Sequence, residues 1–94
     1  MIIKEPIEFL WDKGNHNKNL GKHNVTNEEI EQVFWDEDKK ILVDNKHSTL
    51  EERQILLGKT FKGRVLFLVF TIREGKVRVI SARDLNKKEI NLYH

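Results

Sequence analysis

The sequence contains no cysteine and a single proline, and both features narrow the classes of protein to which it can belong. Without cysteine the chain has no disulfide scaffold, no cysteine-ligated zinc site and no thiol nucleophile. A reducing, cytoplasmic location is the expectation that fits this composition. Pro6 lies near the start of the chain, where it is compatible with the opening of an edge strand.

Long apolar runs are also missing. The longest, Val65–Phe70, has the length of a strand, and no run reaches the roughly 20 residues that a membrane-spanning helix needs. The first residues lack the apolar segment of a secretion signal. We therefore expect no membrane partner, and we expect the 94 residues to form one domain, residues 1–94.

Charge is unevenly distributed along the chain. Residues 1–50 carry 7 Lys/Arg and 10 Asp/Glu, a net charge of −3, whereas residues 51–94 carry 10 and 5, a net charge of +5. A positive field of this kind favours a polyanion such as RNA. A charged, solvated surface without any partner is the other interpretation of the same numbers.

The first quarter of the chain predicts one strand and one weak helix. Ile7–Trp11 alternates loosely between apolar and polar residues, which is typical of a short strand. Lys13–His23 is predicted as a helix, although it is polar and contains two glycines. Asn24 tolerates the left-handed conformation that ends many helices, and Val25 supplies the apolar contact that often follows.

A second helix has clearer signals. Thr26 and Glu29 have the spacing of a capping box, in which each side chain accepts a hydrogen bond from the other residue's backbone N–H. An apolar stripe on one helix face follows it, made of Ile30, Val33 and Phe34. Trp35, beside this stripe, is expected to pack in the core.

The second half of the chain predicts strands. They are Ile41–Val43, Gln54–Thr60, Val65–Ile72 and Lys76–Ser81. The short gaps at Phe61–Arg64 and Glu74–Gly75 predict hairpins. Because Val65–Phe70 is apolar at every position, we expect its strand to be central and covered on both faces. Asn86–Tyr93 is predicted as a short C-terminal helix. The fold class is α+β, a mainly antiparallel sheet with an N-terminal helix pair, in the order β-α-α-β-β-β-β-α.

Four arginines near the last two strands are candidates for binding phosphate: Arg64, Arg73, Arg78 and Arg83. A planar guanidinium donates two hydrogen bonds to phosphate oxygens and offsets the charge that grows on phosphorus during RNA cleavage. Hairpin pairing is expected to gather several of these arginines on one surface. Solvated strand-edge cations are the alternative for each arginine taken singly.

Metal ligands and nucleotide-binding motifs are absent from the sequence. None of His16, His23, His47 and His94 has the spacing of a metal pair, and there is no glycine-rich phosphate loop. We therefore expect no metal and no cofactor. His23 suits either proton transfer or an interaction with a helix end, and His47 suits a loop. Trp11 is expected to shape the site, although core packing is the commoner role for such a residue.

Many of these residues together resemble the BrnT family of type II toxins, whose fold is similar to that of the RelE ribonucleases. The residues that carry the resemblance are Phe9-Leu10-Trp11-Asp12, Asn19, Lys22-His23, Val25, Glu28-Glu29, Val33-Phe34, His47, Glu52-Arg53, Gly58, Gly63-Arg64, Thr71, Arg78-Val79-Ile80-Ser81-Ala82-Arg83, Glu89 and Tyr93. The resemblance covers nearly the whole chain.

The resemblance implies an endoribonuclease that cleaves RNA without a metal, through attack of the 2′-hydroxyl, and arrests growth. It also implies neutralisation by a BrnA-like antitoxin that binds operator DNA, so that the toxin reaches DNA only through the antitoxin complex. The implied catalytic residues are Trp11, Lys22, Arg64 and Arg83. His23, Arg78 and Tyr93 are further candidates for catalysis or RNA binding.

Three positions depart from the family pattern. Leu10 stands where an acidic residue is common, Asn15 where lysine is usual and Asn24 where glycine is usual. Two other functions remain open at this point. One is an RNA-binding module without catalysis, and the other is a protein that acts only as the antitoxin's partner.

Overall fold

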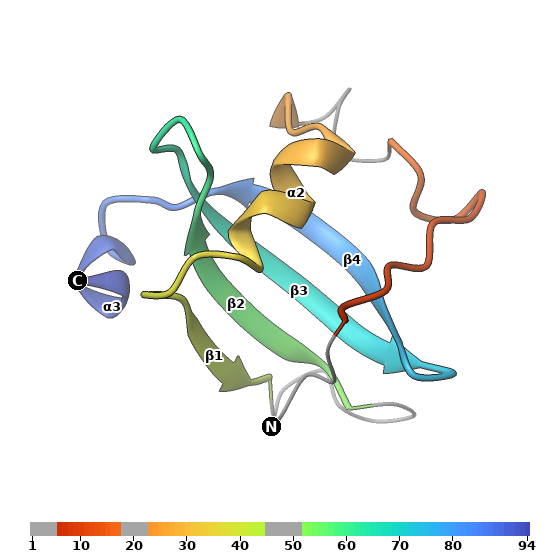
Figure 1. The fold of residues 1–94 in the computed structure, drawn as a ribbon. Helices are drawn as coiled ribbons and strands as arrows, with labels where there is room; N and C mark the ends of the chain where they lie inside the picture. Colours follow the sequence, from red (N-terminus) through yellow and green to blue (C-terminus); the bar gives the residue numbers. More distant parts are fainter. Residues whose placement is uncertain (1–5, 18–22, 45–51) are drawn as a thin grey trace.

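A four-stranded antiparallel sheet forms the centre of the computed structural model, which describes residues 6–17, 23–44 and 52–94. The strand order is β1-β2-β3-β4, α2 lies across one face, and α3 lies beside the β1–β2 side (Figure 1). The elements are α2 (Asn27–Val33), β1 (Lys40–Val43), β2 (Gln54–Lys59), β3 (Val65–Arg73), β4 (Lys76–Asp84) and α3 (Ile90–Tyr93). No helix in the described residues is both long and apolar enough to cross a membrane.

Both predicted hairpins are confirmed. Glu74 and Gly75 join β3 to β4 with φ values of 55° and 76°, and positive φ at both positions is the signature of a type I′ turn, whose twist matches that of the strands. Between β2 and β3, Thr60 N–H donates to the Arg64 carbonyl at 2.8 Å and Gly63 takes a φ of 92°. Local turn chemistry therefore sets the pairing of three consecutive strands.

A β-bulge shifts the register in the middle of the β3–β4 pair. Phe70 lies opposite Val79, whereas Val69 lies opposite Ser81, so Ile80 is an additional residue in β4. Beyond the bulge, side chains of β4 therefore change faces relative to an unbroken ladder. Arg83, which lies opposite Phe67, is one of the residues whose face the bulge decides.

Helix α2 forms as its sequence predicts. Thr26 and Glu29 exchange both capping-box hydrogen bonds at 3.1 Å. Its apolar stripe is buried against side chains from β2, β3 and β4, and the buried cluster includes Ile30, Val33, Phe34, Leu56, Leu68, Phe70 and Val79. Close approach is possible because β2 has Gly58 here, where a Cβ would lie 2.8 Å from the Val33 carbonyl oxygen.

The N-terminal segment differs from the prediction. The strand predicted over Ile7–Trp11 is reduced to one parallel bridge between Phe9 and Val77 at the free edge of β4. Of the helix predicted over Lys13–His23, residues 13–17 form turns, His23 is helical, and residues 18–22 lie outside the described part. The physical reason is Asn15, whose buried amide donates to the carbonyls of Leu10 and Val79 at 2.9 and 3.1 Å and holds the chain in a turn.

Two predictions about burial were wrong in part or entirely. Trp35 is 58% exposed rather than packed, because α2 ends at Val33 and the chain turns away from the core. Strand β3 is central, but its two faces are unequally buried: Leu66, Leu68 and Phe70 are fully covered on one face, whereas Val65, Phe67 and Val69 on the other are half-buried. The second face is therefore partly accessible around Phe67, although Leu57 and Thr71 on the same face are buried.

The C-terminal helix is shorter than predicted. Asn86 and Glu89 do exchange the two capping hydrogen bonds at 3.0 Å, but residues 87–89 form turns and α3 begins only at Ile90. Asn24 adopts a φ of 55°, as its tolerance of the left-handed region predicts, so an asparagine meets the backbone requirement that a glycine would meet here.

Candidate functional site

Arg83 is held in a fixed orientation on the half-open face of the sheet. Its guanidinium carbon lies 4.1 Å from the centre of the Phe67 ring, across the β3–β4 pair. Its two terminal nitrogens donate to the two carboxylate oxygens of Glu89, both at 2.7 Å. The side chain remains 36% exposed. Stacking and a bidentate ion pair restrict the fork to one plane while leaving part of it accessible.

Glu89 is the anion of this pair. Hydrogen bonding by Arg83 lowers the pKa of Glu89, and it outweighs the opposing effect of burial. One of the same carboxylate oxygens also accepts from the backbone N–H of Asn86 at 3.0 Å. Glu89 therefore joins the turn before α3 to the end of β4 and sets the position of Arg83.

Arg64 makes more hydrogen bonds within the protein than Arg83 does. All three of its guanidinium nitrogens donate to acceptors within the protein. Nε and Nη2 bind the carboxylate of Asp84 at 2.6 and 3.0 Å, and Nη1 reaches Glu29 at 3.2 Å. The remaining donations go to the backbone carbonyls of Asn24 and His23, at 2.8 and 3.1 Å. Arg64 therefore connects α2, the end of β4 and the segment that directly follows Lys22 in sequence.

These contacts shift the pKa values of the two carboxylates around Arg64. Hydrogen bonding by Arg64 lowers the pKa of Asp84. Burial raises the pKa of Glu29, but hydrogen bonds from Thr26 and Arg64 outweigh it, and the net shift is downward. The pKa of Arg64 itself is raised, chiefly by its hydrogen bonds to Asp84. Both acids therefore stay ionised and keep the guanidinium paired.

Arg64 and Arg83 lie at the same end of the β3–β4 hairpin but on opposite faces of the sheet. Arg83 pairs with Phe67 on the half-open face, whereas Asp84, the partner of Arg64, pairs with Leu66 on the face under α2. His23 belongs to the Arg64 group through its carbonyl. The described contacts thus give two separate arginine groups.

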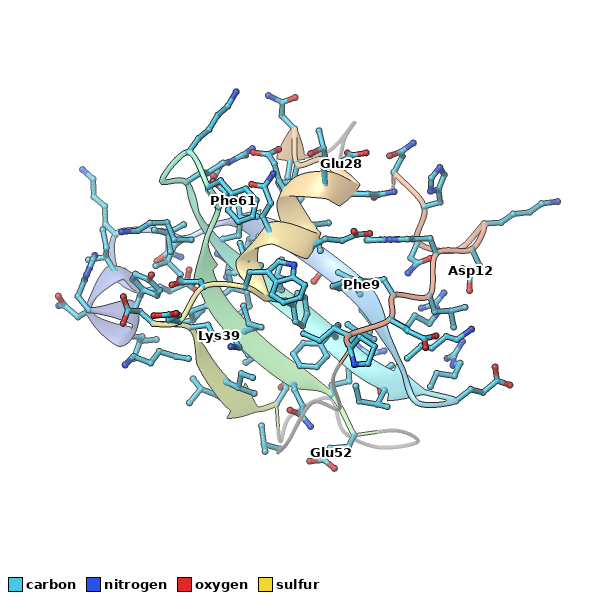
Figure 2. All side chains as sticks on the ribbon, viewed as in Figure 1. Phe9, Asp12, Glu28, Lys39, Glu52 and Phe61 are labelled. Atoms are coloured by element: carbon cyan, nitrogen blue, oxygen red, sulfur yellow. The ribbon has the colours of Figure 1, made fainter. Side chains whose placement is uncertain are left out.

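Arg78 and Trp11 belong to a third group, along the free edge of β4. Arg78 donates to both carboxylate oxygens of Asp12, at 3.3 and 3.1 Å, and its side chain is 16% exposed. This hydrogen bonding lowers the pKa of Asp12. Asp12 lies on the N-terminal segment outside β4 (Figure 2). Trp11 Nε1 donates to Glu31 of α2 at 2.7 Å, so both residues attach this segment to the rest of the fold.

Tyr93 is buried at the C-terminal end of α3. Its hydroxyl donates to Asp36 at 2.5 Å, and the Lys59 ammonium lies 5.8 Å from its ring centre. Burial and the hydrogen bond to Asp36 raise the pKa of Tyr93 to about 12. No described contact joins Tyr93 to the guanidinium of Arg64, Arg78 or Arg83.

The two remaining histidine and lysine candidates, Lys22 and His47, lie outside the described residues. A groove of about 560 Å³ lies beside Arg64 between the start of α2 and the β2–β3 connection. Glu28 and Glu29 balance Lys62 and Arg64 along it, so it offers a polyanion no uniformly positive surface. Within residues 6–17, 23–44 and 52–94, no three His, Asp or Glu side chains gather as a metal site would require.

Phe67 is the part of the Arg83 group that sequence reasoning missed. If the ladder continued unbroken from the two-residue turn at Glu74–Gly75, Ala82 would lie opposite Phe67, and Arg83 would lie on the face under α2. Only the bulge at Ile80 brings Arg83 over the ring. Glu89 was available as a signal, because its capping spacing from Asn86 predicts where its carboxylate lies.

Comparison with known protein families identifies a match over most of the chain. Residues 11–89 match the family model described as "Ribonuclease toxin, BrnT, of type II toxin-antitoxin system". The matched range includes the Arg83–Glu89 pair, Arg64, Arg78 and Trp11, and it ends before Tyr93. A comparison with curated proteins finds no match.

Proposed function

Because the chain belongs to the BrnT family of ribonuclease toxins of type II toxin-antitoxin systems, we propose that it is an endoribonuclease that needs neither metal nor cofactor and arrests growth from the cytoplasm. In the proposed reaction the 2′-oxygen attacks the adjacent phosphorus and the P–O5′ bond breaks. A base takes the 2′-hydroxyl proton, and an acid returns a proton to the departing 5′-oxygen. The products are a 2′,3′-cyclic phosphate and a free 5′-hydroxyl.

The proposal rests on the way Arg83 is held. Negative charge grows on the phosphate oxygens as phosphorus becomes pentacoordinate, and a cation that is already oriented stabilises it without reorganisation. Arg83 is oriented by the Phe67 ring at 4.1 Å and by Glu89 at 2.7 Å, and it lies on the face of the sheet that α2 leaves open. Phe67 also offers an aromatic surface beside the cation, which suits a nucleobase.

We assign supporting roles to the other candidates. Lys22 supplies a second cation, and Arg64 acts with it as a positioning residue, since its Nη atoms hold the carbonyls of His23 and Asn24. Trp11 shapes the site from the N-terminal segment. His23, Arg78 and Tyr93 are secondary candidates for RNA binding or proton transfer.

We further propose a RelE-like fold made of a single domain, residues 1–94, and a BrnA-like antitoxin as partner. The antitoxin neutralises the toxin and binds operator DNA, and the toxin joins it there in repressing their shared promoter. The antiparallel sheet with α2 on one face supports the fold. Membership of a type II toxin-antitoxin family supports the partner.

The proposed role of Arg83 is tested by inducing the Arg83→Ala variant in cells and measuring whether growth still stops. Losing one oriented donor costs on the order of 3 kcal/mol, or about a hundredfold in rate, so induction of Arg83→Ala should no longer arrest growth. Lys39→Ala and Lys76→Ala are the controls. Among the described residues, Lys39 makes a weak 3.5 Å contact to the Asp36 carbonyl and Lys76 a 4.0 Å ion pair with Glu8, so both variants should remain toxic.

Three further measurements distinguish the loss of an oriented cation from misfolding and from a general loss of positive charge. Arg83→Ala must still unfold cooperatively and bind the antitoxin, and Arg83→Lys, which keeps the charge without the fork, should recover only part of the activity. If the lysine controls lose as much activity as Arg83→Ala at equal stability, the general field of the protein drives RNA cleavage and Arg83 has no special role.

A further inference from the structure

Two exposed aromatic side chains flank a hollow at one end of α2. Trp35 follows the end of α2 and is 58% exposed, and Phe61 in the β2–β3 connection is 74% exposed. The hollow has a volume of about 400 Å³, and the α2–β1 connection, including Glu37 and Asp38, forms part of its wall. Figure 2 shows Phe61 where the β2–β3 connection passes α2. Large apolar side chains gathered at a hollow are typical of binding sites for other proteins.

The walls of this Trp35–Phe61 hollow are fixed by hydrogen bonds. The backbone N–H of Phe61 donates to the Gln32 side chain of α2 at 3.0 Å. The backbone N–H of Lys59 donates to Asp36 at 2.8 Å, which ties the end of β2 to the α2–β1 connection. The two aromatic residues are therefore presented by anchored backbone, and a partner would not have to order them first.

The hollow is negatively charged. Asp36, Glu37 and Asp38 lie on one side of it, and among the described residues that line it Lys59 is the single lysine or arginine. The Asp36 carboxylate is used internally, by Tyr93, Lys59 and Asp38. In the described part of the chain, the carboxylates of Glu37 and Asp38 accept no hydrogen bond and form no ion pair. This charge repels RNA and favours a basic partner.

We propose that the Trp35–Phe61 hollow is the docking site for a basic segment of the cognate antitoxin. One apolar side chain of that segment seats between the two aromatic residues, and neighbouring lysines or arginines pair with Glu37 and Asp38. The inference rests on the proposed function, which supplies the partner. It assigns the antitoxin and the RNA to different surfaces: the acidic hollow beside α2, and the cationic Arg83 group on the opposite face of the sheet.

Titration calorimetry of the purified toxin with its purified antitoxin tests this assignment. The double variant Trp35→Ala/Phe61→Ala should weaken binding at least 30-fold, since exposed aromatics at the centre of an interface carry much of its affinity. Glu37→Lys/Asp38→Lys should weaken binding and reverse its salt dependence. Leu92→Ala, at a side chain that is 55% exposed on α3, is the apolar control and should bind as the wild type does.

RNA cleavage by the same variants distinguishes the outcomes, because none of the four residues belongs to the proposed RNA site. Weakened antitoxin binding with unchanged cleavage supports the inference. Unchanged binding overturns it while leaving the proposed function intact. Loss of cleavage, or a change in the toxin's own oligomeric state, overturns it by assigning the hollow to RNA or to a second copy. A wild-type toxin that binds no antitoxin would overturn the proposed function and this inference together.

Discussion

Replacing Arg64 by alanine should destabilise the protein as well as inactivate it. The change removes hydrogen bonds to two carboxylates, Glu29 and Asp84, and to the carbonyls of His23 and Asn24. Hydrogen bonds that involve charged groups contribute about 1.5–3 kcal/mol each when buried, but this side chain is 26% exposed and solvent screens part of the effect. We expect a loss of about 2–3 kcal/mol in the free energy of unfolding, or about 10–20 °C in Tm.

Urea unfolding at pH 7 measures this effect. Lys62→Ala is the matched control, because Lys62 is an exposed cation two residues from Arg64, and it should change the free energy of unfolding by less than about 0.5 kcal/mol. Arg64→Lys should recover only a small part of the loss, since one ammonium cannot reach acceptors on three segments. If Arg64→Ala is as stable as Lys62→Ala and still fails to arrest growth, then Arg64 acts on RNA directly and our positioning role for it is wrong.

Two further predictions concern acid pH and a glycine contact. The folded-state pKa values of Asp84 and Glu89 lie below their ordinary values of 3.8 and 4.5. Their stabilisation is therefore fully present at neutral pH and lost as pH falls below about 5, and Asp84→Asn should flatten the acid limb of a stability–pH curve measured by urea unfolding. Gly58→Ala should cost about 1–3 kcal/mol, because its Cβ would lie 2.8 Å from the Val33 carbonyl oxygen. Gly63→Ala meets no atom within 4 Å, so any loss that it causes in the same unfolding assay comes from its backbone φ of 92° alone.

Features that depend on neighbouring residues were predictable from the sequence. The Thr26–Glu29 capping box, the left-handed Asn24 and the Glu74–Gly75 turn each follow from the chemistry of a few adjacent residues, and all three are confirmed. The α+β class follows from the change of apolar period after α2, and four paired strands confirm it.

The site depends on long-range geometry that the local pattern does not encode. The bulge at Ile80 decides which face Arg83 occupies, and no turn residue marks it in the sequence. Asn15 shows a second limit, because its side-chain amide donates to the carbonyl of Val79, 64 positions away, and residues 13–17 around it form turns instead of the predicted helix. Trp35 shows a third limit. It follows the apolar stripe of α2 in sequence, but it would be buried only if the helix continued beyond Val33.

Cleavage of a defined single-stranded RNA by the purified protein in excess EDTA tests the central claim most directly. We predict cleavage in EDTA, products that end in 2′,3′-cyclic phosphate or 3′-phosphate, and loss of about a hundredfold in rate for Arg83→Ala. Cleavage that disappears in EDTA and returns with magnesium, or products with a 3′-hydroxyl end, would contradict attack by the 2′-hydroxyl without a metal.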